Sequence, residues 1–233
     1  MIPRYAIYYA PRQAHPLSQM ASAWLGRDAF NNQLCARPML AGLEGIDVDA
    51  LTKDPRHYGF HATLKAPFEL HPDQDEGALL AAFRALAAQQ APFSANVEVA
   101  ALGPFLAIVL AEASPAMQAL HQECVIALDR FRAPLSDFDL QRRLHAGMNA
   151  RHESQLREFG YPYIFEDFRF HMTLSERIAD PALRAQVLAD LQDHFQAFAG
   201  PHAFETLAVF KQEARDQPFT ILELEPLSGP SHP

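Results

Sequence analysis

The feature that most constrains the fold of this chain is a short segment that occurs twice, 110 residues apart. Residues 58–64 read Tyr-Gly-Phe-His-Ala-Thr-Leu, and residues 168–174 read Phe-Arg-Phe-His-Met-Thr-Leu. An aromatic residue, Phe, His, Thr and Leu match at five of the seven positions, which indicates an internal repeat. In both copies polar and apolar residues alternate with the period of a half-buried strand. The sequence therefore predicts two related halves, each built around one such strand.

The same order of elements follows each copy of the segment. After the first copy, the pattern predicts a helix at 75–90 and strands at 94–102 and 105–112. After the second copy, it predicts a helix at about 181–198 and strands near 204–210 and 219–224. An aromatic strand at 4–10 and a helix at 17–25 are expected before the first copy, and Pro67 is expected to end its strand. These patterns predict an α+β protein.

We expect residues 1–225 to form a single bilobal domain, with one lobe at about 1–112 and the other at about 113–225. Between the repeats, Ser114 and Pro115 open a further helix, which leads into an Arg-rich insert at 130–151. Residues 226–233 have no apolar periodicity, so we expect a flexible tail there.

Composition narrows the classes of function. The 233 residues carry 19 Lys and Arg against 28 Asp and Glu, a net charge of -9, which disfavours nucleic acid as a partner and favours a small anionic substrate in a local basic pocket. The two cysteines do not form a disulfide framework or a zinc-ligand pattern. The longest apolar run, about 99–111, is shorter than the roughly 18 residues of a spanning helix, and the beginning of the chain has no export-signal pattern. We therefore expect a cytoplasmic protein that does not enter the membrane, and the sequence leaves its oligomeric state open.

The two His-x-Thr segments are the candidate catalytic residues. Residues two apart on a strand point the same way, so His61 lies beside Thr63 on one face, and His171 beside Thr173. A pair of histidines in different protonation states can deprotonate a nucleophile and protonate a leaving oxygen within one displacement. Threonine hydroxyls can hold the nonbridging oxygens of a phosphate as charge develops on them. A single His-x-Thr is often a packing detail, but two in matched repeats indicate a site.

Weaker candidates for substrate binding come from extending the same strand parity. It adds Lys65 to the first face and Arg169 and Ser175 to the second, so that each lobe offers a cation to the phosphate. The alternative is that both cations are merely exposed to solvent. Tyr8 is a candidate to stack on a sugar or base, although core packing is the favoured interpretation. Arg132, in the Arg-rich insert, is a candidate for contact with a second phosphate, although a solvated helical surface is somewhat favoured.

The remaining histidines do not have the spacing of metal ligands. They lack both the HExxH pattern and a paired ligand spacing, so the sequence predicts neither a metal site nor a cofactor.

With its two His-x-Thr segments flanked by apolar positions, the chain resembles the 2H phosphoesterase superfamily, also called LigT-like or cyclic phosphodiesterase-like. Three further segments, 4–11, 58–65 and 160–163, resemble its bacterial branch associated with phosphonate metabolism. The resemblance implies a duplicated bilobal fold in which two antiparallel sheets line a central cleft, with helices outside. It also implies metal-independent hydrolysis of cyclic phosphates or phosphodiesters.

The resulting functional hypothesis is a hydrolase acting on the phosphodiester bond of a small phosphorylated substrate, such as a ribose cyclic phosphate in phosphonate breakdown. Which histidine is the base and which the acid is left open by the symmetry of the motifs. One alternative is a phosphodiesterase of RNA ends that acts on 2′,3′-cyclic or 2′,5′ linkages, which the net charge disfavours. Another is a noncatalytic module that binds a phosphorylated nucleotide or sugar.

Overall fold

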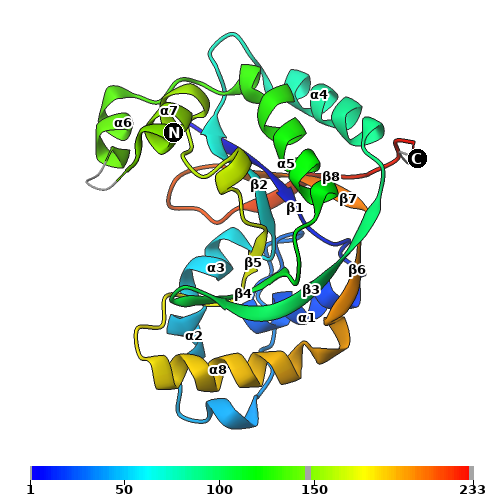
Figure 1. Ribbon diagram of the computed structural model, residues 1–233, viewed down its shortest axis with the longest axis vertical. Helices are drawn as coiled ribbons and strands as arrows, with labels where there is room; N and C mark the ends of the chain where they lie inside the picture. Colours follow the sequence, from blue (N-terminus) through cyan, green and yellow to red (C-terminus); the bar gives the residue numbers. More distant parts are fainter. Residues whose placement is uncertain (1, 145–147, 231–233) are drawn as a thin grey trace.

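One antiparallel sheet runs through the molecule (Figure 1). The computed structural model describes residues 2–144 and 148–230, and within them the sheet has eight strands in the order β6-β3-β4-β5-β2-β1-β7-β8. The strands are β1 (Arg4–Tyr9), β2 (Ala62–Glu69), β3 (Phe93–Leu102), β4 (Phe105–Leu110), β5 (His171–Thr173), β6 (Gly200–Phe204), β7 (Thr206–Gln212) and β8 (Thr220–Pro226).

Helices cover the sheet from outside, which confirms the predicted α+β class. Helix α4 packs on β7 and β8, while α8 packs on β3 and β4, so these two helices lie at opposite ends of the molecule (Figure 1). The α-helices are α1 (Pro16–Leu25), α2 (Val48–Leu51), α3 (Lys53–Tyr58), α4 (Glu76–Gln89), α5 (Pro115–Ala127), α6 (Asp137–Arg143), α7 (Ala150–Phe159) and α8 (Pro181–His194). Short 3₁₀ turns lie at Ala41–Leu43, Asp129–Phe131, Phe165–Asp167 and Gln196–Phe198.

The helices begin where side chains can satisfy their first backbone N–H groups. The Ser114 hydroxyl accepts a hydrogen bond from the backbone N–H of Met117 at the start of α5. The Asp180 carboxylate accepts one from the backbone N–H of Ala182 at the start of α8. A proline follows each cap at the first helical position, where it needs no hydrogen-bond partner. These signals explain why both helices begin where the sequence places them.

The two sheets expected from the sequence are the two halves of one sheet. Strand β2 pairs with β5 through Ala62 and Met172, and this pair joins the half β6-β3-β4-β5 to the half β2-β1-β7-β8. Neither Ala62 nor Met172 exposes any surface, and both belong to the main hydrophobic core. The apolar positions of the two repeated segments therefore meet in the core, which leaves the alternating polar positions on the opposite face.

The two halves of the sheet do not follow the division of the chain at residue 112. The half around β5 takes β3 and β4 from the first part of the chain, and the half around β2 takes β7 and β8 from the last part. The hairpin of β3 and β4 thus crosses to the half around β5, and β7 and β8 cross to the half around β2, whereas β6 stays in the half of β5. A lobe of this molecule is therefore assembled from both parts of the sequence and is not one continuous stretch.

Strand β2 continues past Pro67, which was expected to end it. The pairing of β1 with β2 shifts register between the pairs Tyr5–Phe68 and Ile7–Lys65, so Pro67 lies at an irregularity of the ladder. A bulge is one of the places where a strand tolerates a residue without an N–H group. The strand β6 was not predicted, because its first two residues, Gly and Pro, are typical of a turn.

The chain beyond β8 is only partly described, and the part that is described is held in place. The backbone N–H of Leu227 donates to the carbonyl of Glu205, that of Gly229 donates to Gln90, and the Leu227 side chain is buried. The expectation of a flexible tail from residue 226 is therefore wrong for this part. Residues 231–233 lie outside the described residues.

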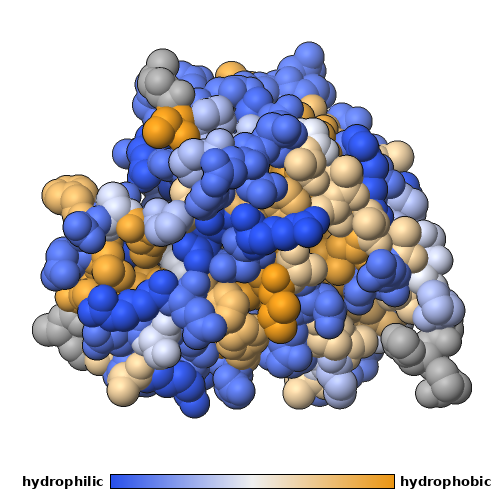
Figure 2. Space-filling model, turned by 90° about the horizontal axis from the view of Figure 1, so that it is seen from above, coloured by the Kyte–Doolittle hydropathy of each residue, from blue (hydrophilic) through white to orange (hydrophobic). Residues whose placement is uncertain are grey.

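The face seen from above is largely hydrophilic, and its hydrophobic residues lie in separate groups (Figure 2). Among the described residues, the helices are too short or too polar to cross a membrane.

Helix α1 is tied to the second repeated segment by Trp24. Its indole Nε1 donates to the carbonyl of Leu174 over 2.8 Å, and the side chain is completely buried. We expect Trp24→Phe to lower the free energy of unfolding by at least about 1–3 kcal/mol, because the carbonyl loses its donor inside the core. Urea denaturation measures the loss, with the exposed Met39→Ala as a control that should change stability by less than about 0.5 kcal/mol. A similar, small change in both variants would contradict the importance of this contact.

Candidate active site

The pairing of β2 with β5 brings the four motif residues together. Because Ala62 lies opposite Met172 in an antiparallel pair, the flanking residues follow in register, with His61 opposite Thr173 and Thr63 opposite His171. All four side chains point to the face opposite the buried pair. Each histidine therefore lies beside the threonine of its own motif and across from the threonine of the other.

Both imidazoles are oriented by the same kind of hydrogen bond. Nδ1 of His61 lies 2.8 Å from the carbonyl of Gly59, and Nδ1 of His171 lies 2.7 Å from the carbonyl of Arg169. A carbonyl only accepts, so each Nδ1 carries the proton and donates, which leaves each Nε2 as a lone-pair acceptor in the neutral ring. The Thr63 hydroxyl lies 3.4 Å from Nε2 of His61. Both rings thus offer a basic nitrogen on the polar face.

Tyr8 supports the first motif from the neighbouring strand. It pairs with Thr63 across β1 and β2, and its ring stacks on His61 with ring centroids 3.9 Å apart and an interplanar angle of 24°. Only 1% of Tyr8 is exposed, so its ring face is occupied by His61 and not open to a sugar or base. The stacking role proposed from the sequence is therefore wrong, and Tyr8 instead fixes the imidazole.

Burial keeps both imidazoles neutral at pH 7. It lowers the pKa of His61 to about 4, since the charged ring would lose hydration, and repulsion from His171 adds a smaller effect in the same direction. Burial also lowers the pKa of His171, against the hydrogen bond to Arg169, which favours the charged form. The pKa of the Tyr8 phenol is raised well above its ordinary value by burial, so its hydroxyl keeps its proton. The site is therefore basic but uncharged in the free protein.

The motif residues open into two adjoining cavities. A cavity of about 450 Å³ contains Thr63 and His171, and its wall includes Tyr161, Tyr163 and Arg169. A second cavity, of about 230 Å³, contains the complementary pair His61 and Thr173, together with Phe105 and Arg177. Each cavity thus holds one histidine and the threonine of the other motif. Together the volumes suit a small molecule.

Lys65 and Arg132 are held by a partner that could not be expected from local sequence patterns. The Lys65 ammonium is buried and donates to the carbonyl of Val125 and to Asp129, over 3.1 and 2.8 Å. Arg132 binds the same carboxylate through two nitrogens, over 2.8 and 3.0 Å. This ion-paired network anchors the end of α5 to β2, so neither cation is free to bind a phosphate and both assignments are wrong.

Of the two remaining candidates, Ser175 has a structural role and Arg169 lies at the larger cavity. Ser175 is buried, accepts a hydrogen bond from the backbone of Leu106 and donates one to the carbonyl of Glu176, so it is structural and its assignment is wrong. Arg169 is exposed, and its side chain lines the larger cavity beside His171. Its guanidinium has no ion pair with a described residue, so substrate binding by Arg169 stays a prediction.

Two residues of the smaller cavity were not predicted as site residues from the sequence. Arg177 and Phe105 line the smaller cavity beside His61 and Thr173. Continuing the strand parity from Thr173 by two more steps would have reached Arg177. Phe105 lies on β4, and its ring centroid is 5.7 Å from that of His171. No local pattern could identify Phe105, because its place depends on the pairing of β4 with β5.

His121, which also lines the larger cavity, has a structural role. Nδ1 of His121 lies 2.8 Å from the carbonyl of Leu64, its Nε2 accepts from the backbone of Phe165, and its ring stacks on Phe168. Both ring nitrogens are therefore occupied. In residues 2–144 and 148–230, no three side chains of His, Cys, Asp or Glu come together in a group that could hold a metal ion.

Comparisons with known proteins agree with this fold and place the chain in a family. The structure is similar to the crystal structure of TT0787 from Thermus thermophilus, with a TM-score of 0.50 and 14% identity over 97% of this chain and 98% of the other. A crystal structure of Escherichia coli LigT with 3′-AMP gives a TM-score of 0.47 and 12% identity over 98% and 99%. At this level of identity, the likeness to TT0787 shows a shared fold. Residues 63–220 match the family model "Protein of unknown function (DUF1045)", and the chain belongs to this family.

Two curated relatives are considerably longer than this chain. A protein of Janthinobacterium sp. (strain Marseille) is 38% identical over 97% of this chain and 51% of its own length. One of Laribacter hongkongensis (strain HLHK9) is 35% identical over 95% and 51%. Both are named ribose 1,5-bisphosphate phosphokinase PhnN. The chain spans about half the length of these relatives, so that name describes the longer proteins.

The orientation of the two imidazoles is directly measurable by NMR of the histidine ring nitrogens. We expect Nδ1 of both His61 and His171 to carry the proton at pH 7 and Nε2 to be bare, with His61 protonating only near pH 4 in the free protein. Adding inorganic phosphate should raise both pKa values, because an anion stabilises the imidazolium. The ring resonances are assigned by comparison with His61→Ala and His171→Ala. An Nε2–H tautomer, or an His61 pKa near the ordinary 6.5, would contradict this geometry.

Proposed function

We propose that this protein is a phosphoesterase that hydrolyses a small cyclic phosphate or phosphodiester without a metal ion. The observation that carries the proposal is the crossed arrangement of the motifs, in which each histidine lies opposite the threonine of the other motif. A tetrahedral phosphate between the two strands then has a basic nitrogen on either side and a hydroxyl beside each nitrogen. This is the set of groups that an in-line displacement requires.

The reaction follows from the positions of these groups. The Nε2 atom of one histidine takes a proton from water as the water oxygen attacks phosphorus. As the phosphorus–oxygen bond of the ester breaks, the other histidine, protonated on Nε2, gives its proton to the departing oxygen. The hydroxyls of Thr63 and Thr173 donate to the nonbridging oxygens, which gain negative charge in the transition state. Water supplies one proton and the leaving group receives one, so the two histidines together return to their starting charge.

We assign the base to His61 and the acid to His171. The acid must bind a proton before the reaction, and an anionic substrate promotes this by raising the pKa of a nearby imidazole. The ring of His61 is stacked beneath Tyr8, and its pKa of about 4 makes protonation difficult. The pKa of His171 is also lowered by burial, but less strongly, and its ring is not stacked beneath Tyr8. His171 therefore takes the proton more readily.

A ribose cyclic phosphate, of the kind expected in phosphonate breakdown, is the proposed substrate. The cavities of about 450 and 230 Å³ suit a sugar phosphate better than an RNA strand, and the net charge of -9 disfavours a polyanion. The name of the longer relatives also refers to a ribose phosphate. These features support testing ribose 1,2-cyclic phosphates first, with nucleoside 2′,3′-cyclic phosphates and a short RNA beside them.

Replacing either histidine should remove most of the activity. We expect His61→Ala and His171→Ala each to lower kcat by about 10²- to 10⁴-fold, the usual contribution of a general acid or base. Thr63→Val and Thr173→Val should cost about 10- to 100-fold, because each removes one hydrogen bond to a charged oxygen. Phosphorus NMR of the panel after EDTA treatment measures turnover, and His71→Ala, which lines neither cavity, is the matched control. Normal turnover by both motif histidine variants would refute the proposal.

A change of leaving group tests which histidine is the acid. The p-nitrophenolate ion is a good leaving group and departs without being protonated. An alkoxide is a poor leaving group and needs a proton from a general acid. We therefore expect His171→Ala to recover most of its lost rate on a p-nitrophenyl phosphodiester, while His61→Ala stays impaired on both substrates. The opposite pattern would exchange the two roles.

A noncatalytic binding module makes a different prediction. It would be stabilised against heat by a member of the panel that is recovered chemically unchanged. If a panel compound raises the melting temperature of the protein with intact His61 and His171 in a saturable way but is not turned over, the protein is a binding module and not an enzyme.

A further inference from the structure

A third cavity, of about 220 Å³, adjoins the cleft and is lined by arginines that the proposed reaction does not use. Ala66, Tyr161 and Ile164 line both this cavity and the larger cavity of the active site, so the two are neighbours along β2. The basic side chains of the third cavity come from β1, β2, α6 and the segments after α5 and β7: Arg4, Lys65, Arg132, Arg143 and Arg215. We call it the arginine cavity.

The charge of the arginine cavity is opposite to that of the chain. Five basic side chains line it against two carboxylates, Glu69 and Asp139, in a protein with a net charge of -9. Asp129 outside it neutralises one of the two cations that it binds, Lys65 and Arg132. An excess of positive charge thus remains in a confined space, where it acts on an anion more strongly than on an open surface.

Two of the arginines have only neutral partners among the described residues. Nε of Arg4 donates to the amide oxygen of Gln212 over 2.7 Å, and Nη1 of Arg143 donates to the carbonyl of Gly160 over 2.8 Å. The ion pairs formed within residues 2–144 and 148–230 do not include either guanidinium. Both therefore keep their full charge and several free N–H donors.

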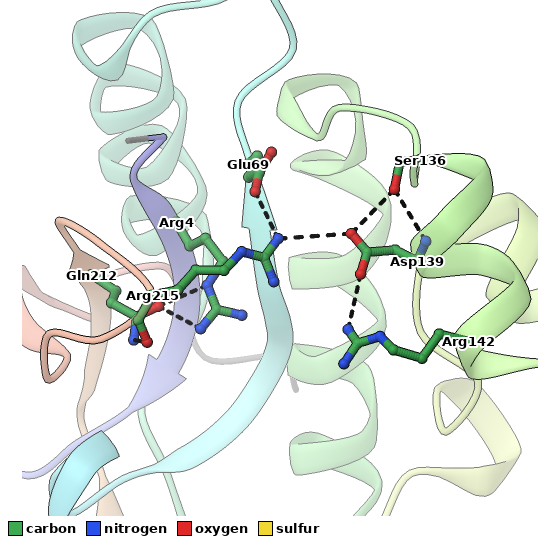
Figure 3. Close-up of polar contacts among 7 residues, drawn as sticks. All are labelled: Arg4, Glu69, Ser136, Asp139, Arg142, Gln212 and Arg215. Carbon is green, nitrogen blue, oxygen red and sulfur yellow. Dashed lines mark hydrogen bonds and ion pairs between the residues drawn. The ribbon is translucent and has the colours of Figure 1, made fainter.

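The third arginine, Arg215, lies near Arg4 and beside two carboxylates. Arg215 binds Glu69 over 2.8 Å and lies 3.7 Å from Asp139 of α6, and its guanidinium is near that of Arg4 (Figure 3). Burial lowers the pKa of Arg4, and the charge of Arg215 lowers it further. The pKa of Arg143 is also lowered, by burial first, and the charges of Arg142 and Arg215 add to this against the opposing charge of Asp139. The three cations thus repel one another in the free protein, and a bound anion would relieve this repulsion.

We propose that Arg4, Arg143 and Arg215 form a subsite for a second phosphate group of the substrate. Guanidinium groups bind phosphate oxygens with paired, directional hydrogen bonds, and three of them around one cavity match the several oxygens of a phosphate monoester. The substrate is then a small cyclic phosphate or phosphodiester that carries a phosphate monoester at its far end.

The spacing of the two cavities fits one sugar ring between the phosphates. Ala66, which borders the arginine cavity, lies three residues beyond Thr63 on β2. Ala66 also borders the larger cavity, so at about 3.3 Å per residue the boundary between the two cavities lies roughly 10 Å along the strand from the catalytic threonine. Tyr161, on the wall between the cavities, is half-buried and lies where it would contact the ring.

This inference rests on the proposed function for its account of turnover, but its binding step is testable alone. The probes are matched pairs that differ only in the second phosphate: ribose 1,2-cyclic phosphate with and without a 5-phosphate, and adenosine 2′,3′-cyclic phosphate with and without a 5′-phosphate. Titration calorimetry of the full chain carrying His61→Ala and His171→Ala measures affinity without turnover. Steady-state assays of the protein with intact histidines measure kcat/KM for the same pairs.

We expect the second phosphate to increase both affinity and kcat/KM in at least one pair by about 10- to 100-fold, the contribution of charge-assisted hydrogen bonds. In Arg143→Gln and Arg215→Gln, the affinity and the kcat/KM for the probe with the second phosphate should fall toward those for the probe without it, so that both ratios approach one. Arg157→Gln is the matched control, because Arg157 is exposed, pairs with Glu153 on its own helix and lines none of the three cavities. In the control the ratio should not change. Melting temperatures check that all three variants are folded.

The outcomes separate the two proposals. The subsite is overturned if the second phosphate does not increase affinity or kcat/KM in the parent protein, even if the enzyme is active. It is also overturned if the increase persists after both arginine substitutions. A high affinity ratio that depends on the arginines, without turnover of any probe, supports the subsite and removes the proposed function. Weak and equal binding of all probes overturns the subsite.

Discussion

The candidate active site depends on one residue pair, Ala62 with Met172, at the centre of the sheet. Burial of these two apolar side chains fixes the register of β2 against β5. A slip of one residue would turn every side chain of the strand to the other face, sending the histidines into the core and the apolar residues into the cleft. The hydrophobic effect at this pair therefore determines which groups face the cavities, and the hydrogen bonds of the imidazoles only refine their orientation.

The sequence predicted the parts of the site that depend on strand periodicity. The alternation around His61 and His171 was sufficient to place both motifs on strands with their polar residues on one face. It was also sufficient to expect that the motifs share a cleft, because matched repeats imply equivalent positions. The position of each histidine opposite the other motif's threonine could not be predicted, since it depends on which residue of β5 lies opposite Ala62.

The parts that failed depend on residues far away in the chain. Strand parity assigned Lys65 to the active face, but Asp129 and the end of α5 bind its ammonium. Ser175 is likewise occupied by the backbone of β4 and its own neighbour. The approach of Arg4 to Arg215 joins opposite ends of the sequence through the pairing of β1 with β7, and no local pattern indicates it. Charge in a sequence shows how many cations exist, whereas the fold decides which carboxylates neutralise them.

The crossing of the strands makes the two repeats inseparable. The hairpin of β3 and β4 completes the sheet around β5, and β7 with β8 completes the sheet around β2. A fragment that ended at residue 112 would keep β3 and β4 but lose the strands on both sides of that hairpin, β5 and β6, and so expose two edges at once. Neither copy of the repeat can therefore exist as a stable half-protein. Each copy therefore completes the sheet of the other, and sequence change in one copy is constrained by the packing of both.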